Sequence, residues 1–370
     1  MNLLAKGASK HSMPLMKVLW VAIALACVWP ASLPGQTPEV ANIRAHAERG
    51  EPEAQNTLGL AYRNGRGVTQ DYTQAAQWFQ KAADKGNPAA QRNLGMLYLD
   101  GLGVKQDRSE AVKWLQKAAE QNFAPAQSFL GLLWVGDNST EKTKEGLNWL
   151  RKAAEANYAE AQEKLGELYL SGKGVAENLP EAIKYFEQAA SQNYASAQDQ
   201  LARLYLDGKG VPKDEAKAAS LFRSAVLQNY ASSQETLGWM YLEGQGVTKD
   251  EAEAARLFKR AAEQKYASAQ NNLGMLYEKG RGVPQDFAKA TDLYRQAAVN
   301  GYGGAQNNLA IAYALGQGVP KDPVEAYVWF TLAETHGDKN RPDLWEAVKK
   351  QLKPEQMAAA EKRVKEFGKK

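Results

Sequence analysis

The chain repeats one pattern of about thirty-six residues eight times along its length. The pattern is clearest at residues 88–123, which contain Ala-Gln-x-x-Leu-Gly-x-x-Tyr, then Gly-x-Gly-Val, then Asp, and then Lys-Ala-Ala. Self-similarity at this period is typical of a solenoid, in which each unit packs only against its neighbours. The array spans residues 52–338, with copies that begin at Pro52, Pro88, Ala124, Ala159, Ala195, Ala231, Ala267 and Gly303.

Each copy predicts two helices joined by a short turn. Ala90, Leu94 and Tyr98 recur at a spacing of four, which places them on one face of a first helix. The Gly-x-Gly at residues 101–103 predicts the end of that helix, because glycine adopts a left-handed conformation without strain. Asp107 with Glu110 follows the D-x-x-E pattern of a capping box and predicts the start of a second helix. The fold class is therefore all-α, with about eight helix-turn-helix repeats.

The eighth position of the copies predicts close packing between helices. Glycine inside a helix costs about 1 kcal/mol relative to alanine. Its regular return therefore indicates that a neighbouring helix approaches the backbone there. The position holds Gly59, Gly95, Gly131, Gly166, Gly238 and Gly274, with Ala202 and Ala310 in the other two copies.

The third copy departs from the pattern, because residues 136–142 replace the Gly-x-Gly-Val turn. We expect a differently shaped loop there. Ser139 and Lys142 match the S-x-x-K motif of penicillin-recognising enzymes. No convincing companion motif accompanies them, so we interpret the match as a coincidence.

Residues 1–36 predict a targeting segment. Lys6, Lys10 and Lys17 precede an apolar run at 18–29, and a proline follows it, as in a secretory signal peptide. The run is shorter than the roughly 20 residues that cross a membrane comfortably. We expect a periplasmic or secreted protein; a retained anchor at residues 18–29 and a lipoprotein at Cys27 stay open as alternatives.

Further helices are expected at both ends of the array, because an open repeat end exposes its core. Residues 37–51 resemble the second half of a unit and predict a lone helix that covers the first repeat. Residues 339–370 predict C-terminal capping helices. Leu344, Val348, Met357, Val364 and Phe367 are their candidate core residues.

The charge balance argues against a polyanionic partner. The formal net charge is +4, and three of these charges lie in residues 1–36, which contain no acidic residue. The remaining +1 gives no electrostatic reason to expect nucleic acid or an anionic membrane surface. The single cysteine, Cys27, lies outside the repeats, so they contain no disulfide and no cysteine-ligated metal.

The unit Ala-x-Ala-Gln-x-x-Leu-Gly-x-x-Tyr-x-x-Gly-x-Gly-Val-x-x-Asp, followed by Ala-x-x-Trp-Phe-x-Lys-Ala-Ala, resembles the Sel-one-like repeat (SLR), a relative of the tetratricopeptide repeat. The closing Glu325-Ala-Tyr-Val-Trp-Phe-Thr-Leu-Ala333 looks like the ending of many bacterial members. The resemblance covers roughly residues 40–367. It implies a right-handed α/α superhelix whose first helices line a concave surface, and a role as an adaptor or scaffold.

The residues themselves indicate no catalytic machinery. The three histidines, His11, His46 and His336, are not spaced as metal ligands or as part of a Ser-His-Asp triad. We therefore expect a non-catalytic scaffold of the bacterial cell envelope that needs no cofactor and binds a protein or peptide. The alternatives are an envelope enzyme acting on peptidoglycan or β-lactams, and a membrane-anchored envelope organiser.

A partner would contact the first-helix positions that vary between copies. Positions five, nine and twelve share one helical face, and by analogy with tetratricopeptide units that face is concave. The fifth position holds mostly polar residues, and the ninth mixes apolar and charged residues, as a peptide groove would. The candidate partner-binding residues are Trp239, Met275, Asn271, Asn307, Arg203, Glu235, Met96 and Arg92. Trp239 and Met275, near Asn271 and Asn307, form the favoured cluster, since aromatic anchors dominate many interfaces.

Overall fold

A computed structural model describes residues 37–137, 139–338 and 341–367. The described residues form nineteen α-helices and no strands, which confirms the all-α prediction. Residues 1–36, which carry the predictions of a signal peptide, an anchor and a lipoprotein, lie outside the described residues. Within the described part, no helix is both long and apolar enough to cross a membrane.

Two helices alternate along the array. The first helices of the eight repeats are α2 (Pro52–Asn64), α4 (Pro88–Asp100), α6 (Ala124–Val135), α8 (Ala159–Ser171), α10 (Ala195–Asp207), α12 (Ala231–Glu243), α14 (Ala267–Lys279) and α16 (Gly303–Leu315). The second helices are α3 (Tyr72–Asp84), α5 (Arg108–Glu120), α7 (Thr140–Glu155), α9 (Leu179–Ser191), α11 (Glu215–Leu227), α13 (Glu251–Glu263), α15 (Phe287–Val299) and α17 (Pro323–Thr335). One helix precedes the array, α1 (Pro38–Glu48), and two follow it, α18 (Pro342–Gln351) and α19 (Pro354–Phe367).

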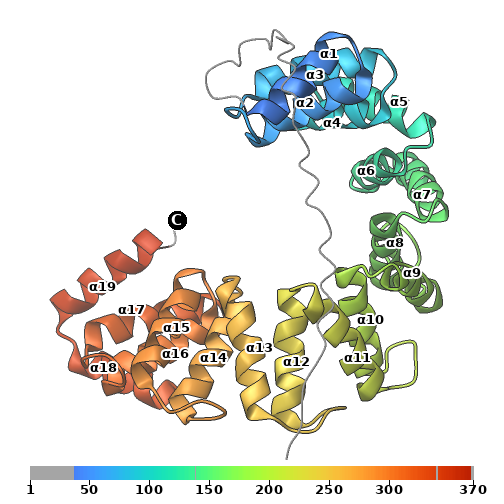
Figure 1. The fold of residues 1–370 in the computed structure, drawn as a ribbon. Helices are drawn as coiled ribbons and strands as arrows, with labels where there is room; N and C mark the ends of the chain where they lie inside the picture. Colours follow the sequence, from blue (N-terminus) through green and yellow to red (C-terminus); the bar gives the residue numbers. More distant parts are fainter. Residues whose placement is uncertain (1–36, 138, 339–340, 368–370) are drawn as a thin grey trace, which may run out of the picture.

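The helices follow an open arc from α1 to α19 (Figure 1). On the right of this view, α6 and α8 lie on the inner side of the arc and α7 and α9 on the outer side. Neighbouring first helices, such as α4 with α6 and α14 with α16, also contact each other directly. The first helices therefore form the concave side, and the helical solenoid matches the predicted architecture.

The eighth-position glycines confirm the prediction of close packing. A Cβ atom added to Gly238 would lie 2.7 Å from the ring of Phe258, and one added to Gly166 would lie 2.6 Å from Phe186. In both cases the ring belongs to the second helix of the same repeat and is fully buried. The missing side chain thus lets the two helices of a repeat pack an aromatic ring against a backbone.

In six of the eight repeats the turn is closed by the two glycines and by the aspartate that follows them. Gly101 ends α4 with a left-handed φ of 67°, and Asp107 Oδ1 accepts hydrogen bonds from Ser109 N and Glu110 N at the start of α5. The other half of the predicted capping box does not form. The Asp107 backbone N–H donates to Tyr98 O at 2.9 Å instead, which ties the second helix to the end of the first.

A glutamine at the fourth position joins consecutive repeats. Gln91 Nε2 donates to Ala83 O at 3.1 Å, and Gln127 Nε2 donates to Ala119 O at 3.0 Å, in each case across a buried boundary. The same bond from Gln55 reaches Ala47 O in α1 at 3.0 Å. α1 therefore occupies the position of a second helix and packs on the first repeat.

The third repeat has the irregular loop that the sequence predicts. α6 ends at Gly136 with φ −77°, so the left-handed turn of the other repeats is absent from this loop. The serine of the S-x-x-K match is the N-cap of α7, where Ser139 Oγ accepts from Lys142 N at 3.5 Å. The earlier start makes α7 sixteen residues long.

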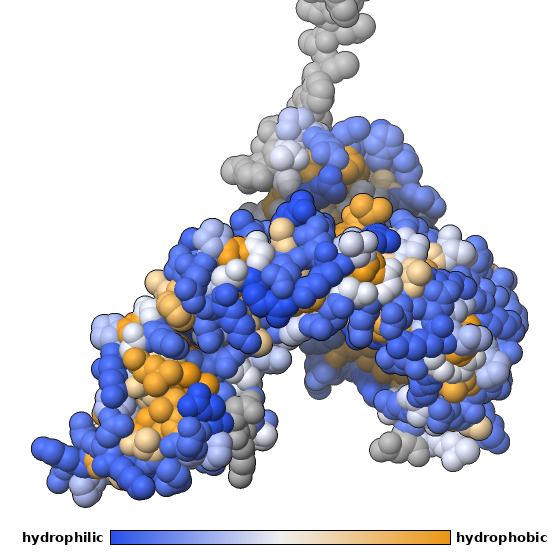
Figure 2. Space-filling view, turned by 90° about the horizontal axis from the view of Figure 1, so that it is seen from below, coloured by the Kyte–Doolittle hydropathy of each residue, from blue (hydrophilic) through white to orange (hydrophobic). Residues whose placement is uncertain are grey.

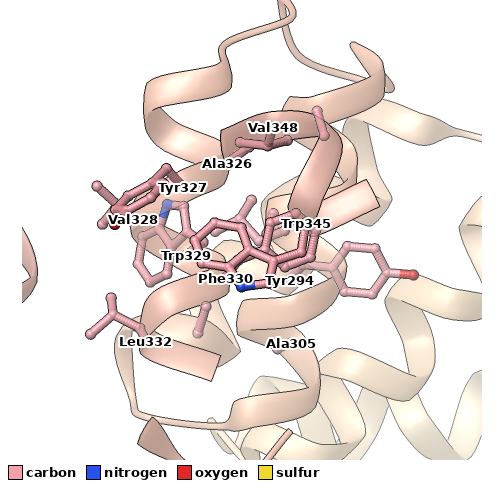
Figure 3. Close-up of a cluster of buried hydrophobic side chains, with 14 of the residues drawn as sticks. Tyr294, Ala305, Ala326, Tyr327, Val328, Trp329, Phe330, Leu332, Trp345 and Val348 are labelled. Atoms are coloured by element: carbon pink, nitrogen blue, oxygen red, sulfur yellow. The ribbon is translucent and has the colours of Figure 1, made fainter. Parts of the chain in front are cut away.

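The C-terminal helices α18 and α19 pack on the last repeat. Trp345 of α18 packs on Phe330 and Tyr327 of α17, with ring centroids 5.2 and 4.9 Å apart (Figure 3). Phe367 of α19 packs against Trp329 at 5.2 Å. All five candidate residues, Leu344, Val348, Met357, Val364 and Phe367, belong to this cluster or pack against it.

Candidate functional site

The concave side presents two rows of side chains from the first helices. The ninth-position row is half-buried in seven repeats and exposed at Trp239, whose relative exposure is 36%. The fifth-position row is more deeply placed: Asn271 and Asn307 are 6% and 2% exposed. The two rows therefore differ in depth, since five fifth-position side chains are buried and none of the ninth-position side chains is.

The fifth-position side chains join neighbouring first helices. Asn93 Nδ2 donates to Asn56 Oδ1, Asn272 Nδ2 to Glu235 Oε1, and Asn308 Nδ2 to Asn271 Oδ1, each at 2.9 Å. In each pair the donor occupies the sixth position of the following repeat. A buried polar group needs such a partner, so Asn271 contributes to stacking. Asn307 belongs to the last repeat, and its buried Oδ1 accepts no hydrogen bond from the described residues.

Trp239 is the exposed aromatic side chain of the concave rows. Its ring meets Phe258 edge-on, with centroids 5.7 Å apart and planes at 69°. The indole also hydrogen-bonds to Glu235, one helical turn earlier. The structure therefore brings Trp239 and Glu235 together. Met275 in the next repeat is half-buried, and its Sδ lies 3.6 Å from Asn271 Nδ2.

Arg203 links repeats five and six. Its Nε donates to Asp199 Oδ2 at 2.8 Å, and its Nη2 donates to Ser232 Oγ and Thr236 Oγ1, both at 2.9 Å. The guanidinium therefore hydrogen-bonds to residues of the two repeats, although the side chain stays 40% exposed. Nearby, burial raises the pKa of Glu235, while hydrogen bonds from Trp239 and the charge of Arg203 oppose that effect.

Arg92 and Met96 form a separate group in repeat two. Both side chains are half-buried, and the Arg92 guanidinium lies 6.0 Å from the centre of the Phe129 ring in repeat three. Three repeats lie between that of Met96 and that of Trp239, so the candidate residues divide into an N-terminal and a C-terminal group.

A row of tyrosines on the same side was missed by the sequence reasoning. A tyrosine directly precedes the first helix in repeats four to eight, and each of these side chains is partly exposed. Burial and the nearby Glu163 raise the pKa of Tyr194, and burial and Glu235 raise that of Tyr302. These rings therefore lie near the concave acids. The signal was present in the sequence as Tyr158, Tyr194, Tyr230, Tyr266 and Tyr302 at one fixed position.

The family model of the Sel1 repeat matches eight consecutive segments, at residues 52–87, 88–123, 124–158, 159–194, 195–230, 231–266, 267–302 and 304–338. The chain belongs to the Sel1 repeat family. Sel1 repeat proteins generally mediate protein–protein interactions, and the scaffold is typically non-catalytic.

Two solved structures illustrate the likeness of this Sel1 repeat protein to others. A Sel1 repeat protein from Oxalobacter formigenes is 30% identical, with a TM-score of 0.63, and the match covers 84% of this chain and 90% of that one. A protective antigen of uropathogenic Escherichia coli with an SLR fold is 26% identical, with a TM-score of 0.53, covering 89% and 94%. Among curated proteins, none matches this chain.

The S-x-x-K match has a structural explanation in this Sel1 repeat protein. Ser139 caps α7, and Lys142 Nζ lies 3.1 Å from Asp137 Oδ2 on the surface. Both side chains therefore make structural contacts within the irregular loop and at the start of α7. In the described part of the chain, no three histidine, cysteine or acidic side chains come together as metal ligands would.

An apolar pocket, separate from the concave rows, lies at the C-terminal end. A pocket of about 670 Å³ opens between the ends of α15, α17 and α19, lined by Val299, Leu332, Val364 and Phe367 among others. Seen from below, the surface is largely hydrophilic, with a compact hydrophobic patch on the side of the C-terminal repeats (Figure 2). Neither feature involves the concave rows of repeats four to six.

Proposed function

We propose that this Sel1 repeat protein is a non-catalytic scaffold that binds an extended segment of another protein on its concave side. One observation carries the proposal: the large ring of Trp239 is exposed on the concave side. The fifth-position side chains near it, in contrast, form hydrogen bonds between adjacent first helices. Exposed aromatic side chains framed by polar groups are enriched at the energetic centres of interfaces.

The surroundings of Trp239 favour a peptide in an extended conformation. The ninth-position row runs from repeat to repeat, so it offers a line of contacts across the first helices. Met275 and Ile311 continue the row as half-buried apolar side chains. An extended segment can place side chains along such a line at regular intervals, while its backbone meets amide and hydroxyl groups from the same helices.

The test is the replacement Trp239→Ala, with Leu227→Ala as its control. Leu227 is 86% exposed at the end of the second helix α11, away from the concave rows. Partners are captured with the purified protein, and calorimetry then measures their affinity for the unmodified protein and for both variants. We expect Trp239→Ala to weaken binding by about 2 kcal/mol or more, and Leu227→Ala to leave it unchanged. A large loss of stability with intact binding would make Trp239 a core residue and refute the proposal.

We further propose that the protein works in the bacterial cell envelope. The basic start and apolar run of residues 1–36 support this placement. N-terminal sequencing of the exported protein tests it. A mature chain that starts near residues 33–36 indicates a cleaved signal, and an intact N-terminus with membrane association indicates an anchor at residues 18–29.

A further inference from the structure

Negative charge is concentrated on the first helices of the three middle repeats. α8, α10 and α12 together carry seven acidic and two basic side chains. The other five first helices each have a net charge of zero. The second helices of the same middle repeats, α9, α11 and α13, also balance their charges overall. The excess is therefore confined to the first helices of one section of the solenoid.

Stacking of the repeats does not require these acids. Glu235 accepts a hydrogen bond from Asn272 in the way that Asn271 accepts one from Asn308, at the same distance of 2.9 Å. A neutral amide thus performs the structural role in repeat seven. Glutamate at the equivalent position adds a charge that must be kept partly out of water, which is unfavourable unless something compensates it.

The compensation within the fold is incomplete. Glu163 is 2% exposed; its Oε1 accepts from Ser196 Oγ at 2.7 Å, and its Oε2 forms an ion pair with Lys164. The Lys164 ammonium lies 3.0 Å from that oxygen, but it also lies 2.9 Å from Glu167 and so serves two carboxylates. Burial raises the pKa of Glu163 and also that of Glu235.

We infer that the partner segment is basic, and that its lysine or arginine side chains bind the acidic concave surface of repeats four to six. This inference rests on the proposed function and names the chemistry of the partner. Charge complementarity selects a cationic segment and disfavours an acidic one. The half-exposed tyrosines beside the acids, such as Tyr194 near Glu163, suit the alkyl stem and charge of such side chains.

The spacing of the repeats suggests the spacing of the basic residues. Packed helices lie about 8–10 Å apart. An extended chain in the polyproline II conformation advances about 3.1 Å per residue with three residues per turn, so every third side chain points to the same side. About three residues of a peptide therefore pass each repeat. Basic residues at every third position would meet repeats four, five and six in turn, and an apolar residue after them would reach Trp239 and Met275.

The experiment compares three labelled peptides of about ten residues that differ only at every third position, which holds lysine, glutamine or glutamate. Fluorescence anisotropy with the purified full chain measures their affinities. We expect the lysine peptide to bind on the order of tenfold more tightly than the glutamine peptide, with an advantage that shrinks as salt rises. The glutamate peptide should bind most weakly.

Two variants with the same change in charge locate the effect. Glu235→Gln keeps an oxygen for Asn272 and should lower the affinity for the lysine peptide roughly two- to fivefold. Glu187→Gln removes an exposed acid from the outer helix α9 and should change nothing. Equal effects of the two variants would overturn the inference.

The outcomes separate this inference from the proposed function. If the glutamine peptide binds as well as the lysine peptide and Trp239→Ala abolishes both interactions, the concave scaffold stands and the basic partner is refuted. If none of the three peptides binds, the inference also fails. The capture experiment with Trp239→Ala then decides the proposed function independently.

Discussion

The second glycine of the Gly-x-Gly turns offers the sharpest test of how the repeats stack. Gly103 has a φ of +69°, and a Cβ atom added to it would lie 2.1 Å from Tyr72 O and 2.5 Å from Thr73 N. Both are backbone atoms at the start of α3 in the preceding repeat. They cannot rotate away as a side chain can, so Gly103→Ala must push the loop off its neighbour.

Gly86 provides a matched control for the backbone conformation alone. It has a φ of +85°, and an added Cβ atom would meet nothing within 4 Å. Alanine in this left-handed region costs about 1–2 kcal/mol, and the less flexible unfolded chain returns about 0.4–1 kcal/mol. We therefore expect Gly86→Ala to lower the free energy of unfolding by about 1 kcal/mol.

Gly103→Ala adds the collision to the same conformational cost. Overpacking of this kind typically costs about 1–3 kcal/mol, which gives a total loss of roughly 2–4 kcal/mol. Urea denaturation measures the difference. Hydrogen exchange of the amides in α3 and α4 localises it, because a repeat array can unfold in parts. If the two variants lose the same stability, the contact between loop and helix does not support the stack, and the reasoning is wrong.

Three further predictions concern stability. Lys265 has a left-handed φ of 63° where four repeats have asparagine, so Lys265→Asn should raise the free energy of unfolding by about 0.5–1 kcal/mol; a loss of stability in thermal denaturation would contradict this. Gln127→Leu removes the hydrogen bond to Ala119 O and should cost about 1–3 kcal/mol, whereas the exposed Gln116→Leu should cost under about 0.5 kcal/mol, as urea titrations can check. Because burial raises the pKa of Glu163, its contribution to stability is most favourable below the pKa of the unfolded chain and is lost as pH rises through the folded value. Glu163→Gln should therefore raise the melting temperature at neutral pH, with the gain vanishing in acid; an equal gain at all pH values would assign the effect to something other than ionisation.

The local signals of this chain were readable because they recur. The glycine at the eighth position predicted a close neighbour, and the Phe258 ring lies against Gly238 as expected. The aspartate caps were likewise predicted, with Asp107 accepting from Ser109 and Glu110. The reciprocal half of the capping box was predicted wrongly, because the Asp107 N–H is already bonded to Tyr98 O. Such a bond crosses the turn and has no signature in the capping pattern.

The exposure of the candidate binding residues could be predicted less well from the sequence. Helical spacing placed positions five and nine on one face, but it could not show that Asn271 lies between two helices while Trp239 reaches the surface. The excess of acids on α8, α10 and α12 was visible residue by residue. Its meaning depends on which helices share the inner side of the arc.

The sequence by itself determined the repeat, its two helices and the turns between them, because these depend on contacts within about one unit and return in every copy. Tertiary structure decided which of the variable side chains are available to a partner. That outcome depends on how far adjacent first helices approach, and so on bonds between residues about one repeat apart, such as Asn272 with Glu235. The same approach leaves Trp239 exposed and gathers the acids of three repeats on one surface.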